Sequence, residues 1–291
     1  MAEPARIAVV GSINLDFVIQ TERLPVAGET VSGGTFFTTP GGKGGNQALA
    51  AQKLGAQVAM VACVGNDPYA QAALANLEAA GVDLSGLMRL DGIATGAAFI
   101  GVDAQGENQI TVASGANAAF TPERAPAITA DWIIAQQEVA PETVQAAAQK
   151  SDAKLCLNAA PVKPVPQALL DRADLIVVNE IEYESYKSQL ASLDALIALT
   201  LGGAGAELHQ NGKTIAKAAA PKVDVKDTTG AGDCFVAALT VFLAQGHAPQ
   251  AALSAACHCG ALATTQLGAQ SGTPSLEDVK AAFPHLDVFR G

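Results

Sequence analysis

The segment with the clearest chemical potential is a glycine-rich turn that leads into a predicted helix. The turn reads Asp227-Thr228-Thr229-Gly230-Ala231-Gly232-Asp233, and the helix formers Cys234 to Leu239 follow it. Free N–H groups in a first helical turn form an anion pocket, which small residues leave open. A carboxylate there can accept the proton of an attacking hydroxyl while the amides stabilise a transferred phosphoryl group. Asp233 is therefore a candidate base, although a plain helix-start aspartate explains this segment alone equally well.

A second glycine-rich stretch, Pro40 to Ala48, superficially resembles a phosphate loop. It is not a Walker A motif, because Gly44 follows Lys43 where that motif requires Ser or Thr. We expect these glycines to let a polyhydroxylated ligand lie against the backbone, with Lys43 and Asn46 donating or accepting hydrogen bonds at its hydroxyls. An ordinary turn is the weaker alternative, since several glycines so close together carry a high entropic cost.

Polar side chains follow the first predicted strand, Ile7 to Val10. In open α/β sheets, ligands bind beyond the carboxyl ends of the strands. This placement makes Asn14 and Asp16 candidate binding residues, with a loop turn as an equally good explanation.

Two later strands end in the same way. Asn179 and Glu182 follow the strand Leu175 to Val178, and the glycine-rich run Gly202 to Gly205 follows the strand Leu196 to Leu201. Because magnesium keeps several waters and takes few protein oxygens, the pair Asn179 and Glu182 could organise a hydrated ion. A solvated acidic helix start is the better explanation of that pair in isolation.

The elements that position these residues alternate between strands and helices, which is typical of a parallel α/β sheet. Between Phe17 and Pro40, and again from Thr95 to Ala113, short β-branched runs and glycines replace this alternation and predict two small β segments that pair as a flap. The predicted strands are Ile7–Val10, Gln57–Val64, Trp132–Ala135, Lys154–Leu157, Leu175–Val178 and Leu196–Leu201, and the clearest helices are Asn46–Leu54, Tyr69–Ala80, Cys234–Ala244 and Ala251–Thr264.

Composition narrows the class of protein. Of 291 residues, 49% are hydrophobic and 15% charged, which is typical of a globular chain. The net charge of −11 argues against a nucleic-acid partner. No apolar run approaches the roughly 18 residues of a membrane span, and no signal peptide is recognisable, so we expect a cytoplasmic location and no membrane partner.

Five cysteines lack the spacing of a zinc site or a disulfide framework. The tempting exception is Cys257-His258-Cys259, which lies within a predicted helix. Neighbours one and two apart diverge on a helix and cannot converge on one ion. We therefore favour buried packing over metal binding for these residues.

Taken together, these segments resemble the ribokinase-like carbohydrate kinase family from Gly11 to about Pro274. The specific feature is the order of five motifs, and the stretch Gly115 to Ala119 adds similarity to the branch that phosphorylates D-ribose. The five motifs are Gly11–Asp16, Gly41–Ala48, Asn179–Glu182, Thr200–Gly205 and Asp227–Asp233.

The resemblance implies a role for each matching residue. Asp233 matches the base, Gly230, Ala231 and Gly232 match the anion pocket, and Asn179 with Glu182 matches the magnesium position. The residues implied to hold the sugar, together with Asp233, are Asn14, Asp16, Gly42, Lys43, Asn46 and Glu138. Those implied to lie along ATP are Asn179, Thr200, Leu201, Gly202, Gly203, Ala204, Gly205 and Gly232. Those implied to hold a potassium ion are Asp227, Thr229, Ala263, Gln266, Gly268 and Gly272.

The resemblance also implies an architecture and a reaction. The expected fold is a single domain over residues 1–291, a doubly wound, mostly parallel sheet with a small β lid at about 14–40 and 95–113, and two lids are expected to clasp into a homodimer. The expected reaction is ATP- and magnesium-dependent phosphorylation of the 5-hydroxyl of D-ribose, activated by potassium. A kinase for another sugar or a nucleoside is one alternative, and a non-catalytic sugar sensor with the same fold is another.

One departure from the family concerns the segment between Glu184 and Leu196. It is shorter than usual where a full helix leads into the next strand. We expect this shortening to leave one face of the sheet less covered.

Overall fold

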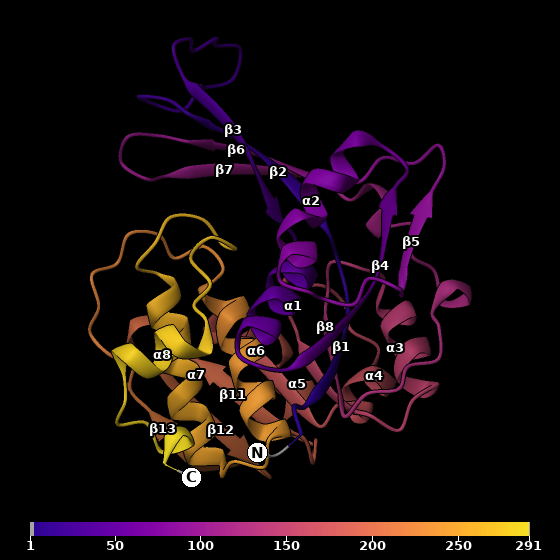
Figure 1. The fold of residues 1–291 in the computed structure, drawn as a ribbon, viewed down its shortest axis with the longest axis vertical. Helices are drawn as coiled ribbons and strands as arrows, with labels where there is room; N and C mark the ends of the chain where they lie inside the picture. Colours follow the sequence, from indigo (N-terminus) through magenta and orange to yellow (C-terminus); the bar gives the residue numbers. More distant parts are fainter. Residues whose placement is uncertain (1–2, 291) are drawn as a thin grey trace.

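Two β-sheets organise the chain, and the computed structural model describes them within residues 3–290 (Figure 1). The main sheet runs in the order β13-β12-β11-β10-β9-β8-β1-β4-β5, with parallel pairing from β11 to β5 and an antiparallel edge formed by β12 and β13. Its strands are β1 (Arg6–Val10), β4 (Gln57–Gly65), β5 (Leu87–Leu90), β8 (Trp132–Gln136), β9 (Lys154–Asn158), β10 (Leu175–Asn179), β11 (Leu196–Thr200), β12 (Ala206–Gln210) and β13 (Lys213–Ala218).

Helices cover both faces of the main sheet, which is why its central strands are apolar along their whole length. In β1, Ile7 and Val9 pack into one hydrophobic core while Ala8 and Val10 pack into the other. The first core includes α1 (Lys43–Lys53), α2 (Pro68–Ala79), α6 (Ala231–Ala244), α7 (Pro249–Ala263) and α8 (Leu276–Ala282). The second includes α3 (Pro141–Gln149), α4 (Gln167–Arg172) and α5 (Glu180–Leu190).

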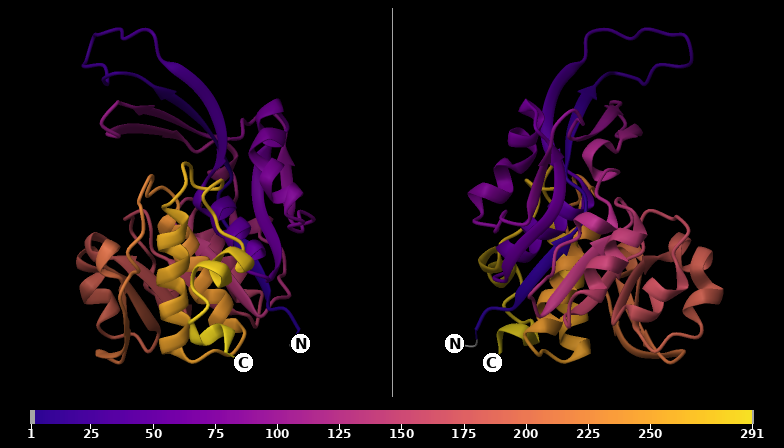
Figure 2. Two further views of the ribbon diagram at one scale, coloured as in Figure 1. Left: turned by 60° about the vertical axis from the view of Figure 1, so that its left-hand side comes forward. Right: turned by 90° about the vertical axis from the view of Figure 1, so that its right-hand side faces the viewer.

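The smaller sheet, here called the lid, has the order β3-β2-β6-β7 and stands away from the main body in all three views (Figures 1 and 2). Its strands are β2 (Asn14–Gln20), β3 (Thr35–Gly41), β6 (Gly96–Val102) and β7 (Asn108–Ala113). Asn14, the first residue of β2, pairs with Gly41 on one side and with Gly96 on the other. The lid is therefore anchored at the point where β1 leads into β2.

The expected fold class, a doubly wound and mostly parallel sheet with a β lid, is confirmed. Two details differ from expectation. Helix α1 begins at Lys43 rather than Asn46, so the glycine-rich stretch forms its first turn. The edge strands β5, β12 and β13 of the main sheet were not predicted.

The short segment after Glu184, expected to leave one sheet face less covered than usual, still packs on that face. Helix α5 continues to Leu190, packs against β10 and β11, and buries Tyr186 and Leu190 in the second core. Leu193 and Ala195 of the connecting turn are buried in the same core. The short segment thus covers the face with one compact helix and its C-terminal turn.

Within residues 3–290, no helix is long and apolar enough to cross a membrane.

The side chains of Cys257, His258 and Cys259 in α7 contact different parts of the protein. The Cys257 Sγ lies 3.7 Å from the Ala218 carbonyl oxygen, and the His258 ring packs edge-on against Phe283. Cys259 is fully buried on the core side of the helix. This divergence is the one that helical geometry requires.

Candidate active site

The candidate site lies beyond the carboxyl ends of β1, β8 and β9, where the strand order reverses between β1 and β8. Such a reversal opens a crevice at the edge of a parallel sheet. Hydrogen bonds across this crevice join α1 to Glu138, which follows β8, to Asn158 at the end of β9, and to Asp233 at the start of α6. Segments nearly 190 residues apart in the chain therefore build one site.

Asp233 is the third residue of α6, and its side chain is buried at 6% exposure. One carboxylate oxygen accepts a hydrogen bond of 2.9 Å from Asn46 Nδ2, and the other accepts one of 2.9 Å from Gln47 Nε2. Burial raises the pKa of Asp233, against the opposing effects of the Lys43 charge and these two amides. A carboxylate with a raised pKa and fixed orientation is suited to accept a proton.

The turn before Asp233 depends on a glycine. Gly230 is the N-cap of α6 with φ of 79°, a left-handed conformation that glycine adopts without strain. A Cβ there would lie 2.8 Å from the backbone of Ala269. Ala231 N donates to the Thr228 carbonyl oxygen at 3.2 Å, and the first helical bond runs from Cys234 N to the Gly230 carbonyl oxygen at 2.9 Å. The N–H groups of Gly232 and Asp233 lie between these two bonds, which is where an anion would bind at a helix start.

The glycines of the Gly42 to Gly45 turn allow close packing within the protein. A Cβ on Gly42 would lie 2.9 Å from the Asn14 N atom, and a Cβ on Gly44 would lie 2.6 Å from the backbone of Ser12. Gly45 N also donates to the Ser12 carbonyl oxygen at 2.9 Å. The missing side chains thus let the start of α1 pack directly on the backbone after β1.

Glu138 is tied to this turn. Its Oε2 accepts hydrogen bonds of 2.5 Å from Ser12 Oγ and 2.9 Å from Lys43 N. Ser12 Oγ in turn accepts from Gly44 N at 3.2 Å. The carboxylate of Glu138 is therefore held in place beside the expected sugar residues.

Asn14 and Asp16 enter the site from the first residues of the lid. Asn117 Nδ2 donates to Asn14 Oδ1 at 2.8 Å, which orients the Asn14 amide. Asp16 Oδ1 is buried and has no hydrogen-bond partner among residues 3–290. Burial, aided by the negative charge of Glu138, raises the pKa of Asp16 to about 7. A buried acceptor without a protein partner is a natural contact for a ligand hydroxyl.

Lys43 supplies the positive charge of the site. Its pKa is raised by Asp233 first, and then by Glu138 and Glu182, in spite of burial. The three carboxylates therefore keep the ammonium group charged, which suits it to an anionic ligand such as phosphate.

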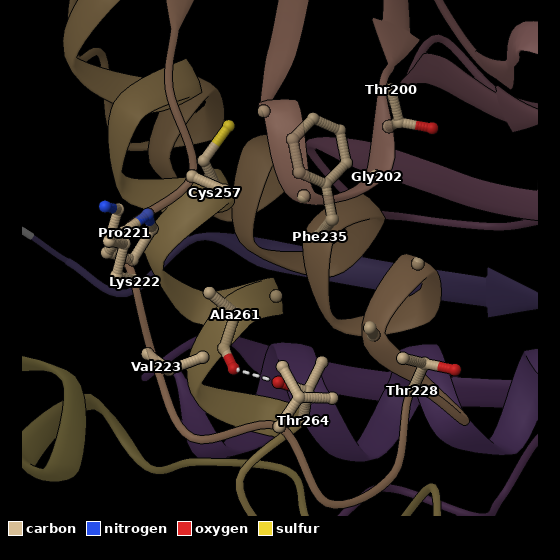
Figure 3. A pocket seen from close by; sticks show the side chains of 17 residues that line it. Thr200, Gly202, Pro221, Lys222, Val223, Thr228, Phe235, Cys257, Ala261 and Thr264 are labelled. Atoms are coloured by element: carbon tan, nitrogen blue, oxygen red, sulfur yellow. Dashed lines mark hydrogen bonds between the residues drawn. The ribbon is translucent and has the colours of Figure 1, made fainter.

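A cavity of about 590 Å³ lies next to the Gly230 turn, between the β11 end and α7 (Figure 3). Its walls are mainly apolar and small, which suits a planar ring system. Phe235 and Cys257 face it from α6 and α7, and Thr228 lines it from the turn before α6 (Figure 3). The lining residues are Thr200, Gly202, Gly203, Gly205, Ala220, Pro221, Lys222, Val223, Val225, Thr228, Ala231, Gly232, Phe235, Cys257, Gly260, Ala261 and Thr264.

This cavity brings together five of the eight residues expected along a nucleotide: Thr200, Gly202, Gly203, Gly205 and Gly232. Leu201, Ala204 and Asn179 do not line it. Leu201 instead closes the turn, since its N–H donates to the Gly205 carbonyl oxygen at 2.8 Å. The exposed Ala204 lies at the outer side of that turn.

Asn179 and Glu182 form a reciprocal capping box at the start of α5. Glu182 N donates to Asn179 Oδ1 at 2.9 Å, and Asn179 N donates to Glu182 Oε2 at 2.8 Å. This geometry supports the helix-start explanation directly. The second carboxylate oxygen of Glu182 makes no hydrogen bond within residues 3–290 and leaves room for a water-mediated role. Among residues 3–290, no three His, Cys, Asp or Glu side chains are placed so that together they could hold a metal ion.

Three of the six residues expected to hold potassium, Ala263, Gln266 and Gly268, have carbonyl oxygens close to Gly272. A Cβ on Gly272 would lie 2.6 Å from the Ala263 carbonyl oxygen, 3.0 Å from that of Gly268 and 3.5 Å from that of Gln266. Asp227 closes this loop, since its carboxylate accepts from Gly268 N at 2.7 Å. Converging carbonyl oxygens suit a hard monovalent cation, so the donor set fits the expected ion.

Sequence reasoning missed the residues that support the site without matching a motif role. Ser12, Gln47 and Asn117 lie inside the quoted motifs, so proximity was the available signal. Asn158 ends the strand β9, where polar groups were expected on general grounds. The cavity wall from Ala220 to Val225 carried no signal, because it is an irregular loop placed by tertiary contacts.

Comparison with known proteins gives a consistent result. The family model described as pfkB family carbohydrate kinase matches residues 4–276. The ribokinase of Bacillus subtilis is 39% identical over 290 residues, covering 94% of this chain and 98% of that protein. A deoxyribokinase of Salmonella typhimurium is 32% identical over 295 residues, covering 93% of this chain and 96% of that protein. The Arabidopsis thaliana ribokinase structure, complexed with ribose and ATP, has a TM-score of 0.84 at 28% identity and covers 96% and 98% of the two chains.

Proposed function

Because the chain belongs to the pfkB family of carbohydrate kinases, we propose that it phosphorylates the 5-hydroxyl of D-ribose to form ribose 5-phosphate. The chain is a phosphotransferase that uses ATP and an alcohol acceptor. The observation that carries the proposal is the Asp233 carboxylate, buried and held by two amides between the sugar-side carboxylates and the Gly230 turn.

In the proposed mechanism, Asp233 accepts the proton of the sugar hydroxyl as its oxygen attacks the γ-phosphorus of ATP. The bond between the attacking oxygen and phosphorus forms while the bond to the β–γ bridging oxygen breaks, and ADP leaves with that oxygen. First-turn amides of α6 and the charged Lys43 stabilise the transferring group. Asn179 and Glu182 would hold a magnesium ion through water, and the ion would supply neutralising charge to the ATP phosphates.

The choice of ribose rests on the polar groups at the sugar side. Asp16 and Glu138 offer acceptors and the oriented Asn14 amide offers its Nδ2 donor, which suits a ligand with several adjacent hydroxyls. The ribokinase relatives support this substrate, and the deoxyribokinase relative supports 2-deoxyribose as the specific alternative. A kinase for another sugar or a nucleoside, and a non-catalytic sensor, are further outcomes, the last opposed by the intact Asp233 and glycine turn.

We also propose that potassium occupies the loop around Gly272 and activates the enzyme. The support is the convergence of the Ala263, Gln266 and Gly268 carbonyl oxygens, together with the Asp227 carboxylate that braces the loop. The loop adjoins the catalytic turn, because a Cβ added to Gly230 would lie 2.8 Å from Ala269 of the loop. An ion there would stabilise the turn that forms the anion pocket.

A homodimer formed through the lids is our proposal for the assembly. The lid exposes large apolar side chains that its own strands leave uncovered. Phe36, Phe99, Ile110 and Val112 are each more than half exposed. Such a density of apolar surface on one small sheet is typical of an interface.

The function is tested by substrate-dependent ADP release over a panel of pentoses, hexoses and nucleosides. A preference for ribose supports the proposal, a preference for 2-deoxyribose or another acceptor supports the alternative kinases, and sugar binding without ADP release indicates a sensor. Asp233→Asn should lower kcat by about 10²- to 10⁴-fold while sugar binding persists. Near-normal turnover of that variant would refute the assignment of the base.

A further inference from the structure

A chain of three buried side-chain amides lies behind the candidate base. Gln47 Nε2 donates to Asp233 Oδ1 at 2.9 Å and to Asn158 Oδ1 at 3.1 Å. Gln136 Nε2 donates to Gln47 Oε1 at 2.6 Å. Gln47 is fully buried and Gln136 is 1% exposed, so neither is a surface group. The network connects the sheet strands β8 and β9, through α1, to the start of α6.

The chemistry of the partners leaves one orientation for each amide. An ionised carboxylate accepts hydrogen bonds and donates none, so Gln47 must present its NH₂ group to Asp233. Its second N–H then reaches Asn158, and its carbonyl oxygen faces Gln136. Gln136 must therefore present its own NH₂ group. A rotated Gln47 amide would bring two donors together at Gln136 and two acceptors together at Asp233.

The far end of the network is left unsatisfied. Gln136 Oε1 is buried and has no hydrogen-bond partner within residues 3–290. It occupies the space beside Gly11, since a Cβ on Gly11 would lie 2.0 Å from this oxygen. An unpaired buried acceptor costs stability, so this arrangement is not explained by folding alone. Orientation of the Gln47 amide is the benefit that the geometry offers.

We propose that Gln47 is a positioning residue that aims the Asp233 carboxylate, and that Gln136 fixes the orientation of the Gln47 amide. This inference rests on the proposed role of Asp233 as the base. Asn46 holds the other Asp233 oxygen but also has a buried oxygen without a partner among residues 3–290, which leaves it available to the sugar. Gln47 has all its polar atoms bonded within the protein and acts on the reaction only through Asp233.

The inference has a consequence for the pH dependence of turnover. The charged groups that face Asp233 are Lys43 on α1 and Glu138 after β8, and both remain when Gln47 is replaced. Burial raises the pKa of Asp233, while the Lys43 charge and the Asn46 and Gln47 hydrogen bonds lower it. Loss of the Gln47 donor should therefore raise the pKa of the base. The acid limb of the kcat profile should move to higher pH.

The experiment compares Gln47→Met, which keeps size and burial but removes the donors, with the wild-type enzyme. At saturating ATP and the sugar preferred by the wild type, kcat should fall about 10- to 100-fold, as expected for one hydrogen bond to a charged group. The acid limb should move upward, and KM for the sugar should change less than kcat. An unchanged acid limb and kcat in a folded variant would overturn the proposal.

Gln136→Met provides a second variant, because it leaves every direct contact of Asp233 in place. It should shift the acid limb in the same direction with a smaller loss of kcat, and it carries the test if Gln47→Met does not fold. An acid limb at the wild-type pH for Gln136→Met would overturn the role of Gln136, and, where Gln47→Met is unfolded, the whole proposal.

The matched control is Gln137→Met. Gln137 is equally buried and adjacent in sequence, but its Nε2 donates to Tyr186 Oη at 2.8 Å, away from Asp233. It should lose stability and keep the wild-type acid limb. Asp233→Asn, measured in parallel, distinguishes the role of Asp233 from that of Gln47. Normal turnover of Asp233→Asn would refute Asp233 as the base. An inactive Asp233→Asn together with a normal Gln47→Met would refute only the positioning role of Gln47.

Discussion

Asp16→Asn should make the sugar-free protein more stable at pH 8 and weaken its binding of sugar. In the structure, Asp16 has a buried oxygen without a partner in residues 3–290, and Glu138 adds a repelling negative charge. These features raise the pKa of Asp16 from 3.8 to about 7. The ionised Asp16 carboxylate therefore destabilises the sugar-free protein until a ligand hydroxyl donates a hydrogen bond to it.

The sign and size of the effect follow from proton linkage. Between about pH 4 and 7 the native state retains a proton that the unfolded state loses, so the free energy of unfolding falls as the pH rises through that range. The full rise in pKa corresponds to about 4 kcal/mol. Because Asp16 retains some exposure, we expect Asp16→Asn to recover about 2 to 4 kcal/mol at pH 8 and much less at pH 5.

Urea unfolding of the sugar-free protein at pH 5 and pH 8 measures this difference. The matched control is Asp67→Asn at the N-cap of α2. Burial opposes ionisation of Asp67, but hydrogen bonds from Thr95 and Ala70 lower its pKa overall, so it is ionised at both pH values and its replacement should change stability equally at both. If Asp16→Asn changes the free energy of unfolding equally at pH 5 and pH 8, the pKa of Asp16 is not raised in the native state.

Three further changes test other parts of the structure. Gly272→Ala would place a methyl group 2.6 Å from a carbonyl oxygen of the proposed potassium loop, so the ratio of activities in potassium and sodium salts should fall to about one; a persisting potassium effect would reject the site. Gly230→Ala forces φ of 79° on an alanine and should cost about 1 to 3 kcal/mol in thermal unfolding, with a marked loss of kcat; a wild-type melting curve would contradict the strain. Ile110→Lys on the lid should convert dimer to monomer in sedimentation experiments, whereas Ile215→Lys on β13, of similar exposure, should not; equal behaviour of the two variants would reject the lid interface.

The order of the motifs was sufficient to predict the family, and the family match confirms that prediction. The parallel sheet could also be predicted from the sequence, since its strands are short apolar runs that end in polar residues. These signals are local. A strand between two layers of helices must be apolar throughout, and a helix start that leaves its amides free must carry small residues.

Tertiary structure decided which side chains act together. The partners of Asp233 on α1 are 186 and 187 residues away in sequence, and no local pattern distinguishes Gln47 from an ordinary helical glutamine. The same holds for the loop from Ala220 to Val225 in the cavity beside the Gly230 turn and for the carbonyl oxygens around Gly272. Backbone carbonyls and irregular loops carry no side-chain signature, so their convergence depends on how the helices pack on the sheet. The sequence determined the chemistry that this protein carries, and long-range packing determined the geometry in which that chemistry meets.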